Sequence, residues 1–374
     1  NESFNLANQG LPLTPRDFHS RLFQYYWITS INPLLQGSNL AFKYHDETAA
    51  RAAVAGRYDG VEGAHMQLVQ LQEKSANREQ ADHHISIAED AIQEIESEFV
   101  QTLADVDLRL AKAEIMIGRG QPSIAEGLLL EGLDLLTQAG ADVFYEQRYR
   151  MELAKSYREM GRADAASIQS SLAIEAVERD DNKLDSRARL TFDQQRREVY
   201  EAAIGFEFGR GEIDTARGYA RRYRTKLLTE AVEQYATSDQ TVANRVAGTR
   251  EGLDELGEGR ILEYTMLKDR LLIWVRTKNA VEGRSYSIGR EDLQQKVDRF
   301  LAIMSDLDRG NELDSLARDL YGFLIAPITD LVEGADSITI VPDRMLHRLP
   351  FAALLSPDGR YLIEDYILTE TLNV

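Results

Sequence analysis

The sequence predicts an α-helical region followed by an α/β domain. From about Leu11 to Gln234 the chain is rich in Ala, Leu, Glu, Gln and Arg, and its apolar residues recur every three or four positions, as amphipathic helices require. After residue 255, runs of β-branched and aromatic residues alternate with helical patterns in the order strand, helix, helix, strand. At 374 residues the chain is long enough for two or more such domains.

Composition and charge exclude several classes of function. The formal net charge is −19, which disfavours nucleic acid and anionic membranes as partners. No apolar run reaches 18 residues, so we expect no membrane span and a cytoplasmic protein. The chain begins with Asn1 and shows no signal-peptide pattern, so we read it as a processed or trimmed piece. The absence of cysteine excludes disulfides, thiolate metal sites and a cysteine nucleophile within these residues.

The histidines indicate no metal site. Of the six, only His83 and His84 are close in sequence, and adjacent helical positions do not share a face. We therefore expect two solvated histidines there, rather than a chelating pair. The sequence predicts no catalytic, cofactor-binding or metal-binding residue and no cofactor.

Glycine-containing breaks divide the helical region into hairpins. They lie at Gly56, Gly120, Gly161 and Gly211, where a helix can end in a left-handed residue. A shift of 41 residues superposes the second break on the third, and with it a set of small and bulky positions: Ala113 on Ala154, Met116 on Tyr157, Ala125 on Ala166, Gly132 on Ala173 and Leu133 on Ile174. Small residues let two helices approach closely.

This pattern resembles the tetratricopeptide repeat (TPR), and residues 1–234 are predicted to form four or five irregular TPR-like helical repeats. An unrelated helical bundle is the alternative. A TPR-like array would form a solenoid whose concave face binds a protein partner. The basic stripe RRYRTKLL, from Arg221, either faces water and nearby carboxylates or contacts an acidic partner or the following domain.

Residues 235–255 are predicted to form a linker and a helix, and the α/β region follows. From Ile261, two strands are joined by a short turn at residues 268–270. Another strand passes into a helix near Gly289, with Ser287 as a candidate cap. A second amphipathic helix is interrupted or ends near Pro327, and SITIV, from Ser337, has the apolar composition of a buried, central strand.

The last third of the chain resembles the CHAT domain, a caspase-like cysteine peptidase family related to separase that typically follows TPR repeats. The family pattern is a Leu-Ile-x-Pro helix end, a strand, Pro-Asp, then Leu-His-x-x-Pro-Phe. It is matched by Leu324, Ile325, Pro327, Pro342, Asp343, Leu346, His347, Pro350, Phe351 and Leu354. The preceding helix keeps Ala216, Tyr219, Ala220 and Arg224 of the family pattern but has Arg221 in an acidic position. The resemblance spans roughly residues 195 to 374.

The resemblance implies that residues 256–374 form the N-terminal part of a caspase-like domain, with a sheet of parallel strands covered by helices. The family's catalytic His and Cys follow later strands, and the chain stops before either motif, so no residue carries over as catalytic. For His347 we expect a structural role, with one ring nitrogen bonded to a backbone carbonyl.

The sequence therefore predicts the regulatory and structural part of a CHAT cysteine peptidase. The resemblance implies that the parent protein is a cysteine endopeptidase, that a partner on the repeats activates or inhibits it, and that prokaryotic relatives act in defence. The expected second partner is the C-terminal half of the CHAT domain, carrying His and Cys. The alternative is a non-catalytic TPR scaffold with a degenerate CHAT module.

Overall fold

The computed structural model describes residues 39–54, 56, 58–138, 143–179, 186–235, 259–304 and 311–372. Its contacts divide the chain into two compact units, Asn1–Leu184 and Asp185–Val374. No helix in the described part is long and apolar enough to cross a membrane.

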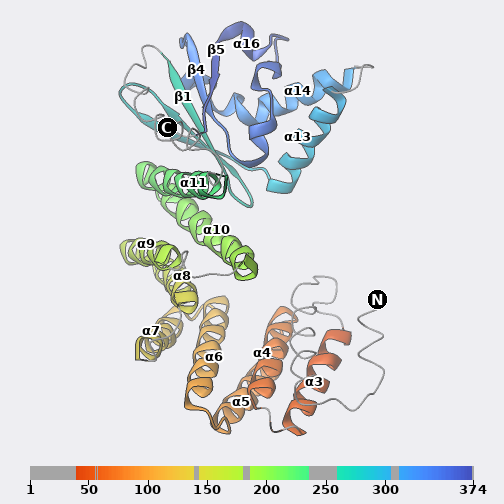
Figure 1. Ribbon diagram of the computed structural model, residues 1–374, viewed down its shortest axis with the longest axis vertical. Helices are drawn as coiled ribbons and strands as arrows, with labels where there is room; N and C mark the ends of the chain where they lie inside the picture. Colours follow the sequence, from red (N-terminus) through yellow and green to blue (C-terminus); the bar gives the residue numbers. More distant parts are fainter. Residues whose placement is uncertain are drawn as a thin grey trace. The chain divides into compact units, whose positions relative to one another are not determined.

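The described part of the first unit is built from antiparallel helices (Figure 1). They are α3 (Asn39–Val54), α4 (Tyr58–Lys74), α5 (Arg78–Gln93), α6 (Glu98–Gly118), α7 (Pro122–Gln138), α8 (Val143–Glu159) and α9 (Ala163–Arg179). The pairs α4–α5, α6–α7 and α8–α9 pack most extensively, and α4 also packs on α6 and α6 on α8. The unit therefore consists of stacked helical hairpins.

The tight turns at Gly120, Gly161 and Gly211 have one geometry, and Ala76 shares it. All four residues have positive φ, and in each turn the next residue donates its N–H to the carbonyl five positions earlier, as in Asn77 to Gln72. This is the Schellman arrangement that ends a helix and satisfies its last carbonyls. The predicted breaks at Gly56, Gly120, Gly161 and Gly211 are confirmed, and Gly56 lies between the packed helices α3 and α4. The turn of the α4–α5 hairpin lies at Ala76, which the sequence did not predict.

The small positions of the 41-residue repeat are buried between helices. Ala125, Ala166 and Ala173 are fully buried. Gly132 on α7 leaves room for the ring of Tyr149 on α8, because a Cβ atom there would overlap the Cε1, Cζ and Oη atoms of that ring. The Tyr149 hydroxyl donates a 2.6 Å hydrogen bond to the carbonyl of Val106 on α6, so one side chain ties three helices together.

The second unit contains six described helices, a five-stranded sheet and three short 3₁₀ turns. Its helices are α10 (Ser186–Gly209), α11 (Ile213–Tyr235), α13 (Arg290–Met304), α14 (Asn311–Leu324), α15 (Thr329–Val332) and α16 (Leu362–Asp365). Its strands are β1 (Arg260–Met266), β2 (Leu271–Arg276), β3 (Val281–Tyr286), β4 (Ser337–Val341) and β5 (Ile367–Glu370). The 3₁₀ turns are η2 (Ala326–Ile328), η3 (Arg344–Arg348) and η4 (Phe351–Ala353).

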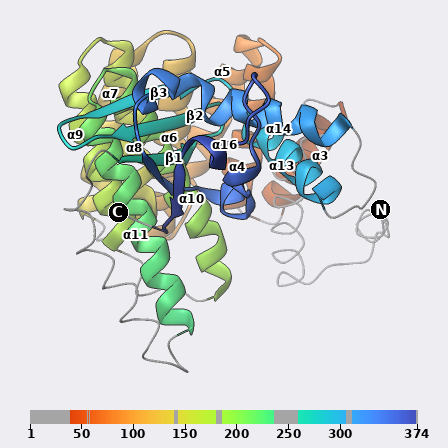
Figure 2. The ribbon, with the colours of Figure 1, turned by 90° about the horizontal axis from the view of Figure 1, so that it is seen from above.

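The sheet is mixed, with strand order β3-β2-β1-β4-β5. The β1–β2 and β2–β3 pairs are antiparallel, as Figure 2 shows for these three neighbouring strands, and only β1–β4 and β4–β5 are parallel. The parallel pairing that the resemblance implied holds for β1, β4 and β5 but is wrong for the β1–β2 and β2–β3 pairs, because connections this short can only reverse the chain. The predicted hairpin from Ile261 and the interior position of β4 are confirmed.

Side chains alternate between the two faces of the sheet, and each face packs on different helices. Leu262, Tyr264 and Ile273 join the apolar core beneath α13 and α14. The opposite face carries Trp274, whose ring meets Phe208 of α10 edge-on, with the ring centroids 6.1 Å apart. The helices α10 and α11 thus pack with the sheet. The sequence had instead predicted one helical domain over residues 1–234. The predicted linker at 235–255 lies outside the described residues.

The ends of the later helices are close to those predicted. α13 begins at Arg290, and the carbonyl of Gly289 accepts the first helical hydrogen bond, so Gly289 rather than Ser287 occupies the cap position. α14 ends at Leu324, just before the 3₁₀ turn that contains Pro327. A proline lacks the N–H that a continuing helix would need.

Candidate functional site

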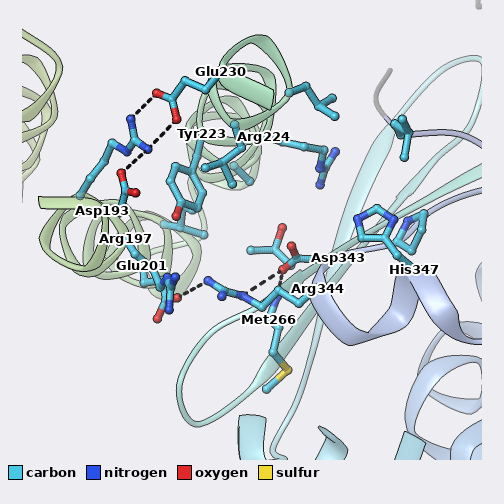
Figure 3. Close-up of a pocket in the computed structure, with 18 of the residues that line it drawn as sticks. Asp193, Arg197, Glu201, Tyr223, Arg224, Glu230, Met266, Asp343, Arg344 and His347 are labelled. Atoms are coloured by element: carbon cyan, nitrogen blue, oxygen red, sulfur yellow. Dashed lines mark hydrogen bonds and ion pairs between the residues drawn. The ribbon is translucent and has the colours of Figure 1, made fainter. Parts of the chain in front are cut away.

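A cavity of about 610 Å³ lies at the carboxyl ends of the parallel strands (Figure 3). Its walls are α10, α11, the end of β1, the segment after β4 and the end of β5. Because parallel strands end at one edge of a sheet, residues far apart in sequence meet there, and this edge is where α/β sheets bind ligands. The cavity is therefore the candidate functional site of the second unit.

The Pro-Asp motif after β4 joins two strand ends at this cavity. Oδ2 of Asp343 accepts a 2.7 Å hydrogen bond from the backbone N–H of Met266, the last residue of β1. Arg344 follows with a positive φ of 53°, a conformation that costs a non-glycine residue free energy. Its Nη2 atom lies 2.8 Å from Oε1 of Glu201 on α10. Asp343 and Arg344 therefore hold β1, β4 and α10 around the cavity.

A second ion pair closes the wall formed by α10 and α11. Arg196 is 1% exposed, and its guanidinium binds Glu230 on α11 at 2.5 Å and Asp193 at 2.9 Å (Figure 3). The rings of Tyr200 and Tyr223 stack nearby with centroids 4.9 Å apart. A buried cation held by two carboxylates keeps these two helices in one register.

The helix pair is attached to the sheet through one buried carboxylate. Glu263 on β1 is 1% exposed, and its Oε1 atom accepts a 2.5 Å hydrogen bond from Nε of Arg217. Arg224 lies 3.4 Å from the other carboxylate oxygen and donates to the carbonyl of Tyr264 at 3.2 Å. Burial and the nearby Arg217 lower the pKa of Arg221. The basic stripe from Arg221 therefore contacts the following sheet through Arg224.

Arg197 is the cation in this cavity that is not neutralised by the protein. Its Nε atom is buried without a hydrogen-bond partner, and none of the residues that the structure describes forms an ion pair with it. Arg197 is half-buried, and water or a ligand can satisfy the part of its guanidinium group that faces the cavity. An anionic ligand group would find its cationic partner at Arg197.

His347 lines the same cavity, from the turn that follows β4. Within the described part of the chain neither ring nitrogen bonds a backbone carbonyl, so the expected structural hydrogen bond is wrong. Burial is the main cause that lowers its pKa, Asp343 opposes this effect and Arg224 adds to it. The ring is exposed and faces the cavity (Figure 3), so solvent rather than a backbone carbonyl is available to its nitrogen atoms.

The histidine pair of the first unit also differs from the prediction. His83 is exposed, but His84 is 9% exposed, and its Nδ1 atom lies 3.0 Å from Nδ1 of His65. Two solvated histidines were expected, and His84 instead pairs with a residue 19 positions away on the neighbouring helix. Among the described residues no group of three or more His, Asp or Glu side chains could hold a metal ion.

Comparison with protein families identifies one segment of the chain. The family model of the CHAT domain matches residues 314–373, which run from α14 to the end of β5. The chain therefore contains CHAT-domain sequence. No curated protein matches it. The match includes the Pro-Asp motif and His347, two of the features that line the cavity.

Proposed function

We propose that this chain is the regulatory and structural part of a caspase-like CHAT cysteine peptidase. In this proposal the first unit is a TPR-like array that binds an activating or inhibiting protein. The parent protein acts in the cytoplasm, in a prokaryotic defence pathway. The CHAT match over α14 to β5, at a cavity bounded by parallel strand ends, is the observation that carries the proposal.

The unpaired edge of the sheet supports a second partner. β5 is an edge strand, and the side chains along and beside it are strongly exposed, with Ile363 at 60%, Ile367 at 70% and Leu372 at 53%. Open edges with apolar side chains pair readily with another strand. A parallel strand added at β5 would end beside the cavity, because the end of β5 already lines it.

The added segment supplies the chemistry that this chain lacks. A thiolate nucleophile and a histidine that manages its proton are both needed for peptide hydrolysis by this class. The sequence holds no cysteine, so the nucleophile comes from the C-terminal half of the CHAT domain. In this assembly the anion-accepting cavity lies beside the dyad and contributes to substrate binding.

The test combines this chain with the polypeptide encoded immediately downstream of residue 374. The two polypeptides should co-purify and hydrolyse members of a peptide library, whereas the chain alone should hydrolyse none. Ile367→Lys should weaken association at least tenfold. Ile124→Lys, at an isoleucine of α7 that is 53% exposed, is the matched control and should leave association unchanged.

The same experiment distinguishes the peptidase from the alternative function, a non-catalytic scaffold. A non-catalytic scaffold with a degenerate CHAT module would bind its partners without hydrolysis, whatever segment is supplied. Association with no hydrolysis, and no labelling of a cysteine by a thiol-reactive peptide probe, would support the scaffold and contradict the peptidase.

A further inference from the structure

Carboxyl groups gather where three helices of the first unit pack side by side. α6 lies against both α4 and α8. Glu62 comes from α4, Asp107 and Glu114 from α6, and Glu152 from α8. We call these four residues the acidic cluster.

Glu62 is buried in this cluster without a partner. Its side chain is 7% exposed, and no described residue forms a hydrogen bond or ion pair with it. The charged or titratable groups that act on it are Asp59 on its own helix, Asp107 on α6 and Tyr145 on α8, none of which is a cation. Burial, Asp107 and Asp59 raise the pKa of Glu62 to about 8. An ionised carboxylate at this position therefore requires a cation that the protein does not provide.

The rest of the acidic cluster is only partly neutralised. The Tyr145 hydroxyl donates a 2.9 Å hydrogen bond to Asp107, whose pKa is raised by burial, an effect that Tyr145 and the charge of Arg148 oppose. Arg148 lies 3.3 Å from Glu114, and Lys155 lies 2.5 Å from Glu152. Both cationic side chains are 42% exposed, so this part of the cluster can be reached from solvent.

We propose that the acidic cluster binds a Lys- or Arg-bearing segment of a protein partner, with one cationic side chain placed between Glu62 and Asp107. This inference rests on the proposed function of the helical unit and names the chemistry of its partner. Complementary charge favours a basic segment, because the cluster has four carboxyl groups and two cations. A long, flexible cationic side chain can reach a recessed carboxylate. A metal ion is the less suitable cation, because no three His, Asp or Glu side chains among the described residues are arranged to hold one.

Proton release is a consequence of this mode of binding. A cation beside Glu62 favours its ionised form and lowers its pKa, so the carboxyl group gives up a proton when the segment binds. Affinity should therefore rise between pH 6 and pH 8 and level off above that range. Added salt should weaken binding.

The test measures binding of a capped peptide of alternating arginine and alanine to the full chain by fluorescence anisotropy. The same peptide with glutamine in place of arginine is the control ligand. Glu62→Gln and Asp107→Asn should each weaken arginine-peptide binding at least fivefold and reduce its rise with pH. Glu159→Gln removes an exposed carboxylate from α8 and should change affinity less than twofold.

Three results would overturn the proposal. Equal affinity of all variants would show that the net charge alone attracts the peptide. Equal binding of the glutamine peptide would show that charge is not recognised. Thermal stabilisation by Mg²⁺ or Ca²⁺ in the wild type but not in Glu62→Gln, without peptide binding, would show a metal site. The assay uses the chain without the downstream polypeptide, so its outcome is independent of whether a peptidase assembles.

Discussion

Gly132→Ala should destabilise the helical unit, although alanine is the better helix former. The new methyl group would overlap the ring of Tyr149, which must then move and lose its hydrogen bond to the Val106 carbonyl. Overpacking costs about 1–3 kcal/mol, and the buried Tyr149 hydroxyl left without a hydrogen-bond partner costs about 1–3 kcal/mol more. The gain in helix propensity returns about 1 kcal/mol. We expect a net loss of about 1–5 kcal/mol in the free energy of unfolding.

Gly127→Ala is the matched control for this prediction. Gly127 lies on the same helix, is exposed, and has no atom within 4 Å of the position of a Cβ atom. Its substitution should be neutral or stabilise by up to about 1 kcal/mol. Urea unfolding followed by circular dichroism measures both variants. Equal stability of the two would refute the packing of Tyr149 against Gly132.

Other substitutions test separate contacts. Ala166→Leu should cost about 1–3 kcal/mol by overpacking α8 against α9, whereas Glu159→Gln should stay within about 0.5 kcal/mol in the same urea titration. Burial lowers the pKa of His45 from 6.5 to about 4, so the unfolded chain binds a proton at this histidine before the folded chain does. The free energy of unfolding should therefore fall by about 2–3 kcal/mol between pH 6.5 and pH 4. His45→Gln should flatten that part of the pH profile, and an unchanged profile would contradict the burial of His45. Glu263→Gln leaves buried Arg217 and half-buried Arg224 without their carboxylate and should cost about 3–5 kcal/mol, whereas Glu282→Gln, at an exposed position of β3, should be nearly neutral.

Local patterns in the sequence predicted most elements of the fold. The β1–β2 hairpin, the interior strand β4 and the turns at Gly120 and Gly161 follow from alternation, apolar runs and glycine. The turn at Ala76 was missed because an alanine occupies a left-handed position where glycine is usual. The resemblance implied parallel strands, whereas the short turn at residues 268–270 predicted the antiparallel hairpin that is present.

Contacts between distant residues could not be read from the sequence. His65 and His84 meet only because α4 and α5 are antiparallel, and neither residue stands out alone. Arg224 was noted as part of a basic stripe, but its partner Glu263 lies on a strand that reads as apolar. Glu62 looked like an ordinary helical glutamate, since only packing shows that it is buried without a cation.

Amide hydrogen exchange at the two edges of the sheet tests most directly whether a further strand completes the CHAT sheet at β5. The downstream polypeptide should slow exchange of the amides of Ile367–Glu370, because a new strand pairs with β5. Exchange at the opposite edge, Val281–Tyr286, should not change. Unchanged exchange at β5 with the polypeptide bound, or protection at β3 instead, would contradict completion of the CHAT sheet at β5.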